Sequence, residues 1–213
     1  MMEPRRLELK GITMRIAIIG AGNVGSGLGR AFATEGHAIV FGVRDPDSAK
    51  TTEALAGTPG ATAMSPARAV EGADVIVFAL RWDGVAGTVA DMPSLDGRVV
   101  IDAMNRFGGD TARSTTQDLA DLLPGARLAK AFDTTGFENF TTAHARRTPA
   151  AMFVAGDDAE AKRVAMDLAT QIGFEAEDAG PLANARALEE MARVWLALTQ
   201  VHGRRIGFAL SRE

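Results

Sequence analysis

The feature that most constrains the fold is an apolar run that leads directly into a glycine-rich segment. Residues 15–19 are apolar after the first position and have the length of a buried strand. The next six residues follow a GxGxxG spacing: Gly20, Ala21, Gly22, Asn23, Val24 and Gly25. A helical pattern starts at Asn23 and stops before Gly36. A strand, a glycine turn and a helix that starts inside the turn predict the first unit of a parallel α/β sheet.

Short apolar runs and alanine-rich helical stretches continue to alternate along the chain. The runs expected to be strands are residues 37–43, 74–80, 98–102 and 126–131. Such alternation is typical of a parallel sheet with helices on both faces. We therefore predict an α/β fold, with a Rossmann-type doubly wound parallel sheet in residues 14–135. Residues 1–13 carry several charges and no apolar stretch, and are predicted to be an N-terminal extension.

Residues 136–213 are predicted to form a smaller, mostly helical C-terminal region that extends the α/β fold. Residues 134–149 resemble a loop or short helices, and strands are expected at 150–155 and 174–178. Between these strands a helix is expected, with Asp157 as its N-cap, Glu160 at its third position and Gly173 just after its end. A long helical region follows.

An apolar stripe at helical spacing marks this last region. Its members, expected to be packing residues, are Leu188, Met191, Val194, Trp195, Leu198 and Val201. Residues 194–198 are apolar on all sides, and apolar residues recur in 206–210. Because a monomer would expose part of this surface, we expect a homodimer that uses the C-terminal helical region. The alternative is that both stretches pack against the chain's own sheet.

Composition excludes several classes of function. The net charge of −4 argues against nucleic acid or an anionic membrane as a partner, and no apolar run approaches the ~20 residues of a membrane helix. Without cysteine there is no disulfide framework or thiolate nucleophile, and without tyrosine there is no Tyr/Lys proton-donor pair. The three histidines, His37, His144 and His202, lack metal-ligand spacing, so no metal site is expected. A cytoplasmic protein is predicted.

The glycine segment has the properties of a dinucleotide site. Gly20 permits a tight turn, and Gly22 lets a pyrophosphate approach the backbone without meeting a Cβ atom. Gly25 allows the helix to pack closely on the strand, and the helix N-terminus presents free N–H groups to an anion. All six residues from Gly20 to Gly25 are therefore candidates for cofactor binding.

The end of the second expected strand indicates which nicotinamide cofactor binds. A site for NAD(H) would place a carboxylate there, whereas this chain has Val43 followed by Arg44. A guanidinium suits a ribose 2′-phosphate, so NADP(H) is favoured. Asp45 comes one residue too late and is expected to start a turn, and Lys50 could add positive charge. The alternative is that Arg44 is a solvated surface residue.

With these residues in view, the chain resembles the family of F420-dependent NADP oxidoreductases. The matching stretches are residues 14–25, 41–44, 79–82, 131–134, 156–158 and 178–182. The cytosolic reductase domain of STEAP metalloreductases is similar in the same stretches. The resemblance implies that Val43 and Arg44 lie at the ribose 2′-phosphate. It further implies that Leu80, Arg81 and Trp82 lie along the nicotinamide half, and that Asp133 and Thr134 border the substrate.

The chain departs from this family at two positions. The family often has a hydroxyl residue where this chain has Val43, and a histidine can stand near the acceptor where this chain has Asp133. The resemblance implies hydride transfer between NADP(H) and a deazaflavin, coenzyme F420, or a flavin as second substrate.

The residues are consistent with such a small-molecule hydride acceptor, because a ketone would usually need a positioned proton donor. Lys130, Asp133 and His144 could serve as donors, although Lys130 is expected to extend into solvent from a strand end and His144 to lie in a loop. No catalytic side chain is assigned. The alternatives are an NADPH-dependent reductase of a small imine or carbonyl and a non-catalytic NADP(H)-sensing module.

Overall fold

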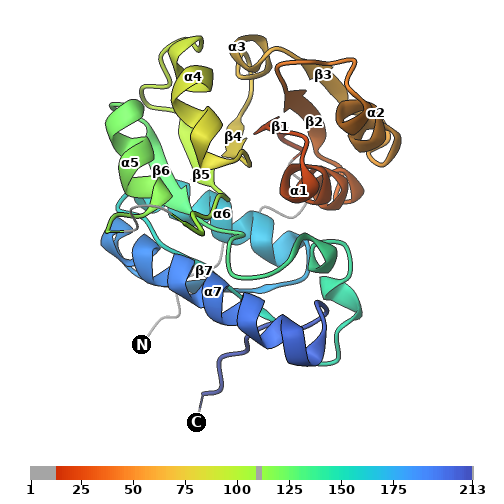
Figure 1. Cartoon of the computed structure of the whole chain (residues 1–213), viewed down its shortest axis with the longest axis vertical. Coiled ribbons are helices and arrows are strands. Elements are labelled where there is room, and N and C mark those ends of the chain that lie inside the picture. The colour runs from red at the N-terminus through yellow and green to blue at the C-terminus, as the bar shows by residue number, and fades with distance from the viewer. Residues whose placement is uncertain (1–12, 109–111, 213) are drawn as a thin grey trace, which may run out of the picture.

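The computed structural model describes residues 13–108 and 112–212, so most of the predicted N-terminal extension lies outside the described residues. Its centre is a six-stranded parallel sheet in the order β3-β2-β1-β4-β5-β6 (Figure 1). The strands are β1 (Arg15–Ile19), β2 (Ala38–Gly42), β3 (Thr62–Met64), β4 (Val75–Phe78), β5 (Val99–Asp102) and β6 (Arg127–Lys130). A separate parallel pair is formed by β7 (Ala151–Val154) and β8 (Glu175–Asp178).

Within the described residues, seven α-helices connect and follow these strands. They are α1 (Asn23–Thr34), α2 (Ala49–Ala56), α3 (Pro66–Ala69), α4 (Val85–Ala90), α5 (Thr115–Leu122), α6 (Ala159–Gln171) and α7 (Ala185–His202). Short 3-10 turns precede α4 and α7 and interrupt the loop between β6 and β7. The doubly wound Rossmann-type fold is thus confirmed.

Alternate residues of the central strands pack into different cores. Ile16 and Ile18 of β1 face a core that includes side chains of α1, α2 and α6. Ala17 and Ile19 face the opposite core, which includes side chains of α3, α4 and α5. The central strands are buried on both faces and are therefore nearly continuous in apolar residues.

The order of strands reverses beside β1. This strand pairs with β2 on one side, where Ile18 is opposite Phe41, and with β4 on the other, where Ile18 is opposite Val77. In open parallel sheets a ligand crevice forms outside the carboxyl ends of the strands at such a switch point. The fold therefore places the ends of β1, β2 and β4 around one crevice.

The C-terminal region packs on the far edge of the sheet. Helix α6 contacts β5, β6 and β7, and a single antiparallel bridge joins Lys130 to Ala155. Helix α7 runs along the lower side of the molecule and contacts α5 (Figure 1). The indole N–H of Trp195 donates to the carbonyl of Ile206 at 3.0 Å, so the segment after α7 folds back on the chain.

Three expectations from the sequence need correction. The N-cap of α6 is Asp158, whose Oδ1 accepts from the Ala161 N–H at 2.8 Å, whereas Asp157 accepts from the Leu182 N–H. Strand β3 was not expected, because it has three residues and none is fully buried. The stripe of α7 is not one packing face: Leu188 and Trp195 are buried, whereas three members are exposed, namely Val194, Leu198 and Val201. In the described part of the chain no helix is long and apolar enough to cross a membrane.

Candidate functional site

The glycine turn is built by close contacts that exclude side chains at two of its three glycines. Gly20 has a φ of +109°, and a Cβ atom there would lie 2.6 Å from the carbonyl oxygen of Ala79. A Cβ atom at Gly25 would lie 2.0 Å from the carbonyl oxygen of Gly20. These contacts agree with the expected roles of Gly20 in the tight turn and of Gly25 in helix packing.

Gly22 is different, because a Cβ atom there would meet no protein atom within 4 Å. It is the N-cap residue of α1, and no side chain caps the helix or places an acid in its first turn. The helix N-terminus therefore keeps free N–H groups and a partial positive charge beside an open space. This arrangement fits a pyrophosphate, which needs anion-binding donors and room near the backbone.

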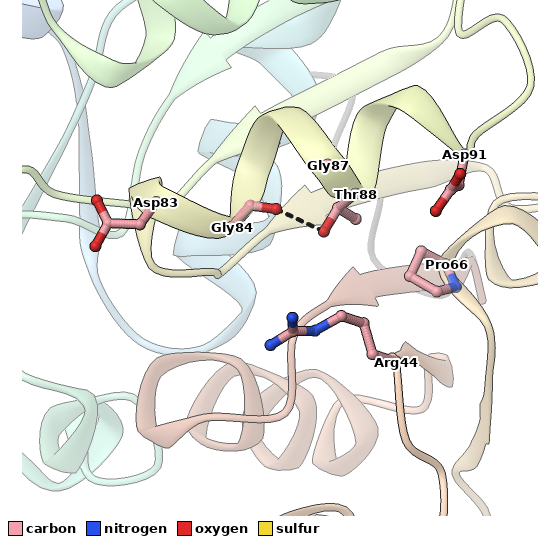
Figure 2. Close-up of a pocket in the computed structure, with 7 residues that line it drawn as sticks. All are labelled: Arg44, Pro66, Asp83, Gly84, Gly87, Thr88 and Asp91. Atoms are coloured by element: carbon pink, nitrogen blue, oxygen red, sulfur yellow. Dashed lines mark hydrogen bonds between the residues drawn. The ribbon is translucent and has the colours of Figure 1, made fainter.

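Arg44 follows β2 and lies across a groove from α4 (Figure 2). The groove has a volume of about 360 Å³ and is lined by Arg44, Pro66, Asp83, Gly84, Gly87, Thr88 and Asp91. The Arg44 side chain is exposed and makes no hydrogen bond or ion pair with another described residue. The guanidinium is therefore available to an external anion.

The neighbours of Arg44 have other roles. The Val43 side chain is 9% exposed and belongs to the core, and the Val43 N–H donates to Met64 at 2.9 Å. Asp45 Oδ1 accepts from the Asp47 N–H at 3.0 Å, so it starts a turn as expected. Lys50 lies on α2 and does not line the groove. Of the two residues expected at a 2′-phosphate, only Arg44 offers a side-chain donor.

The segment after β4 lies beside the glycine turn. The Leu80 side chain comes within 3.0 Å of the position that a Cβ atom of Gly20 would take. Arg81 is almost fully exposed, with Asp83 at 3.7 Å. The guanidinium of Arg106 stacks over the Trp82 ring at 4.5 Å from its centroid. Leu80 thus lies directly beside the turn, whereas Trp82 packs partly against the core on the α3, α4 and α5 side of the sheet.

Asp133 and Thr134 follow β6 and are almost fully buried, with 3% and 1% of their surface exposed. Neither carboxylate oxygen of Asp133 nor the hydroxyl of Thr134 has a hydrogen-bond partner among the described residues. Asn105, after β5, donates from Nδ2 to the Asp133 carbonyl at 2.9 Å, and its own Oδ1 is also without a partner. Unpartnered buried polar groups are rare and indicate a missing ligand or a functional role.

A buried cluster of charges lies next to this pair. The ammonium group of Lys130 donates to Asp102 Oδ2 and Glu189 Oε1, each at 3.2 Å, to Thr115 Oγ1 at 2.9 Å, and to the Met104 carbonyl. The side chains of Lys130 and Asp102 are fully buried and that of Glu189 is 1% exposed. Its position at a strand end had suggested that Lys130 extends into solvent. This expectation is wrong, because the side chain is fully buried.

The charges in this cluster shift two pKa values. Burial raises the pKa of the Asp133 carboxyl to about 7, opposed by the positive charge of Lys130 and assisted by the negative charges of Asp102 and Glu189. Burial also lowers the pKa of Lys130, but attraction to the surrounding carboxylates outweighs it and leaves that pKa above its ordinary value. Lys130 is thus a permanent cation, whereas Asp133 titrates near neutral pH.

Sequence reasoning missed Asp102, Asn105 and Glu189. Asp102 could have been noticed as a carboxylate at the end of an otherwise apolar strand run. Glu189 is followed by a second glutamate, Glu190, on α7 and gives no comparable signal. Among the described residues, no group of three His, Cys, Asp or Glu side chains is arranged to hold a metal ion.

Comparison with known proteins is consistent with this geometry. Residues 15–106 match the sequence profile of the family described as NADP oxidoreductase, coenzyme F420-dependent. The match spans β1 to β5 and identifies the family that this part of the chain resembles. It is a family of NADP-dependent oxidoreductases, so the predicted resemblance, the oxidoreductase class and NADP(H) as cofactor are confirmed.

Two curated relatives and one solved structure show how far the likeness extends. The F420-dependent NADP reductase of Methanothermobacter thermautotrophicus is 29% identical, over 89% of this chain and 91% of its own length. Metalloreductase STEAP3 of Rattus norvegicus is 26% identical over 82% of this chain, which spans only 36% of STEAP3. The structure of a proposed F420-dependent NADP reductase from Arthrobacter sp. FB24 is 25% identical with a TM-score of 0.79, over 93% of this chain and all of that chain.

Proposed function

We propose that the protein transfers a hydride between NADP(H) and a deazaflavin, coenzyme F420, or a flavin-like acceptor. The observation that carries this proposal is the extent of the likeness to the Methanothermobacter reductase, which includes nearly all of both chains. The likeness to STEAP3 covers about a third of that protein and supports only the shared nucleotide-binding part.

The chain's own residues fit NADP(H). We assign the pyrophosphate to the N–H groups of the turn from Gly20 to Gly25, with Gly22 at the point of closest approach. We assign the 2′-phosphate to Arg44, which lies across the groove from α4 and whose side chain has no partner among the described residues. Leu80, Arg81 and Trp82 would border the nicotinamide half, and Asp133 and Thr134 the acceptor. NADP(H) supplies the hydride, and these residues hold its donor and acceptor in reach of each other.

The acceptor can be identified by measuring NADPH oxidation against a panel of compounds. The panel contains coenzyme F420, FMN, ferric citrate and the cyclic imine 1-pyrroline, each at the same concentration. We expect reduction of F420 or FMN at a rate well above that of the other two. The proposal would be contradicted if only ferric citrate were reduced, or if no member of the panel were reduced.

Imine reduction is the second candidate, because one observation favours it. An imine nitrogen takes up a proton as its carbon accepts hydride, and Asp133 is a buried carboxyl with a pKa of about 7. Faster oxidation of NADPH with 1-pyrroline than with F420 or FMN would favour this candidate.

We further propose that two copies of the chain associate through α7. Met191 is half-buried, and three further apolar residues of this helix are exposed at alternating spacings of four and three: Val194, Leu198 and Val201. This stripe repeats every seven residues, which suits a two-fold contact between identical helices. Sedimentation of the wild type and of Leu198→Glu tests this. A dimer that the substitution dissociates is expected, and a wild-type monomer at micromolar concentration would contradict it.

With NADP(H) as cofactor and no cysteine in the sequence, we propose the cytoplasm as the location of the protein.

A further inference from the structure

We infer that Asp133 is the acid that delivers a proton to a nitrogen of the acceptor during hydride transfer. The inference rests on the proposed function and specifies the acceptor's chemistry: a C=N group, which is part of a conjugated ring system in a deazaflavin or a flavin and isolated in a simple imine. It also makes Asp133 a catalytic residue.

The position of Asp133 follows from the topology of the sheet. It lies three residues after the end of β6, and Asn105 lies three residues after the end of β5. Because the strands are parallel, these ends share one edge of the sheet with the glycine turn after β1. The link from Asn105 Nδ2 to the Asp133 carbonyl joins the two strand ends at this edge.

The carboxyl group of Asp133 is buried without hydrogen bonds from its described neighbours. It is 97% buried, and neither oxygen makes a hydrogen bond to any other described residue. The adjacent hydroxyl of Thr134 and Oδ1 of Asn105 lack partners as well. Burying a carboxyl group without hydrogen bonds from other residues destabilises the folded state. Such a group is expected at a site where a bound molecule supplies the missing hydrogen bonds.

The backbone before Asp133 is strained and firmly anchored. Phe132 has a φ of +64°, the only positive value at a described residue other than glycine. Its ring packs edge-on against Phe32 and Phe140, at centroid distances of 5.6 and 6.2 Å. Its N–H points to the sulfur of Met152 at 3.2 Å. Strain of this kind persists where the surroundings impose it, often at functional sites. Here it fixes the direction in which the chain presents Asp133.

The charged groups around Asp133 suit an acid that must give up a proton. Lys130 of β6 stabilises the carboxylate once formed, whereas Asp102 of β5 and Glu189 of α7 oppose its formation. Burial, the largest effect, also favours the neutral acid. The balance leaves Asp133 protonated in a large fraction of molecules at neutral pH and able to ionise there.

The step balances as follows. The C4–H bond of the NADPH nicotinamide breaks, and its electron pair forms a new bond to the acceptor atom that takes the hydride. The O–H bond of Asp133 breaks, and a bond from the same proton to the acceptor nitrogen forms. NADP⁺, the reduced acceptor and the Asp133 carboxylate result, and the carboxylate regains a proton from solvent.

The test compares Asp133→Asn with the wild type, using Asp167→Asn as the matched control. Burial also raises the pKa of Asp167, which lies on α6 and pairs with Arg163. For the acceptor identified by the panel, wild-type kcat/KM should be constant below pH 7 and fall above it. Asp133→Asn should lower it about 100-fold or more and remove the pH dependence, with unchanged NADPH affinity. Asp167→Asn should behave as wild type. A pH profile unchanged by Asp133→Asn would overturn the inference.

A second measurement does not depend on turnover. Infrared spectra of the wild type should contain a protonated carboxylic acid band at pH 6 that disappears by pH 8 and is absent from Asp133→Asn. Absence of this band from the wild type would overturn the inference whatever the acceptor. If the band is present but F420 and FMN are not reduced, the proposed acceptors fail while the acid remains, and 1-pyrroline becomes the substrate to test. Reduction of ferric citrate alone, which needs no proton on nitrogen, would overturn the inference.

Discussion

Replacing Lys130 by Met tests the energetics of the buried charge cluster most directly. The substitution removes the ammonium group and keeps much of the side-chain volume, so few packing contacts are lost. It leaves Asp102 and Glu189 with no cation, although both are at most 1% exposed. Removing one partner of a buried ion pair typically lowers the free energy of unfolding by about 3–5 kcal/mol. We expect a loss in this range at pH 8.

Urea unfolding followed by circular dichroism measures this loss. With a denaturant dependence of about 2–3 kcal/mol per molar of urea, the midpoint should fall by about 1–2.5 M. The matched control is Lys162→Met, because Lys162 also pairs with a carboxylate, Asp178 at 2.8 Å, but in a half-exposed pair. Surface pairs contribute about 0–1 kcal/mol, so the control midpoint should barely move.

The destabilisation should also depend on pH, with a sign that the structure fixes. Without the Lys130 cation, which lowers it, the folded-state pKa of Asp133 should rise further above its unfolded value. Between those values the folded state binds more protons than the unfolded state, so lowering the pH stabilises it. The loss caused by Lys130→Met should therefore be smaller at pH 5 than at pH 8. A loss below about 1 kcal/mol, or one that is equal at both pH values, would refute this account of the cluster.

Three further predictions concern the nucleotide site and the acid. Arg44→Ala should weaken NADPH binding by about 1.5–3 kcal/mol and leave NADH binding unchanged, as measured by fluorescence titration; equal losses would argue against the 2′-phosphate assignment. Gly22→Val should fold normally by circular dichroism but not bind NADPH, because its side chain meets no protein atom and would occupy the space for the pyrophosphate; normal binding would place the pyrophosphate elsewhere. Relative to Asp133→Asn, wild-type stability should fall by on the order of 4 kcal/mol between pH 4 and pH 8, because the pKa of Asp133 is raised from 3.8 to about 7 on folding. Urea unfolding of Asp133→Asn should lack this fall, and the same fall in the variant would contradict the raised pKa.

Local patterns were enough to predict the geometry of the glycine turn. The glycine turn needs only a strand, three glycines and a helix in sequence, and the structure gives Gly20 and Gly25 the close contacts that those roles require. Arg44 could be predicted because the residue that recognises the adenosine ribose follows the end of the second strand in this type of fold. Its exposure, and the absence of a partner for its side chain in residues 13–108 and 112–212, are consistent with that prediction but could not be derived from the sequence.

The rest of the site depends on contacts between distant segments. Lys130 meets Asp102 across 28 residues of chain and Glu189 across 59, and no periodicity of a single segment indicates such a meeting. Helical spacing alone likewise could not tell that Trp195 would be buried while Val194 remained exposed, because a helix apolar on all sides has no unique inner face. The burial that makes Asp133 a candidate acid is a tertiary property of the same kind.

Lys130 affects both the stability of the fold and the pKa of Asp133, and the variants Lys130→Met and Asp133→Asn can separate these two effects. Lys130 binds Glu189 of α7 and thereby ties the C-terminal region to β6, and its charge also lowers the pKa of Asp133 three residues further on. Lys130→Met should therefore reduce stability and at the same time shift the pH dependence of turnover upward, since Asp133 would lose its nearby cation. Asp133→Asn removes only the acid and leaves the ties between Lys130 and α7 in place. If Lys130 contributed only to stability, Lys130→Met would reduce stability without shifting the pH dependence of turnover.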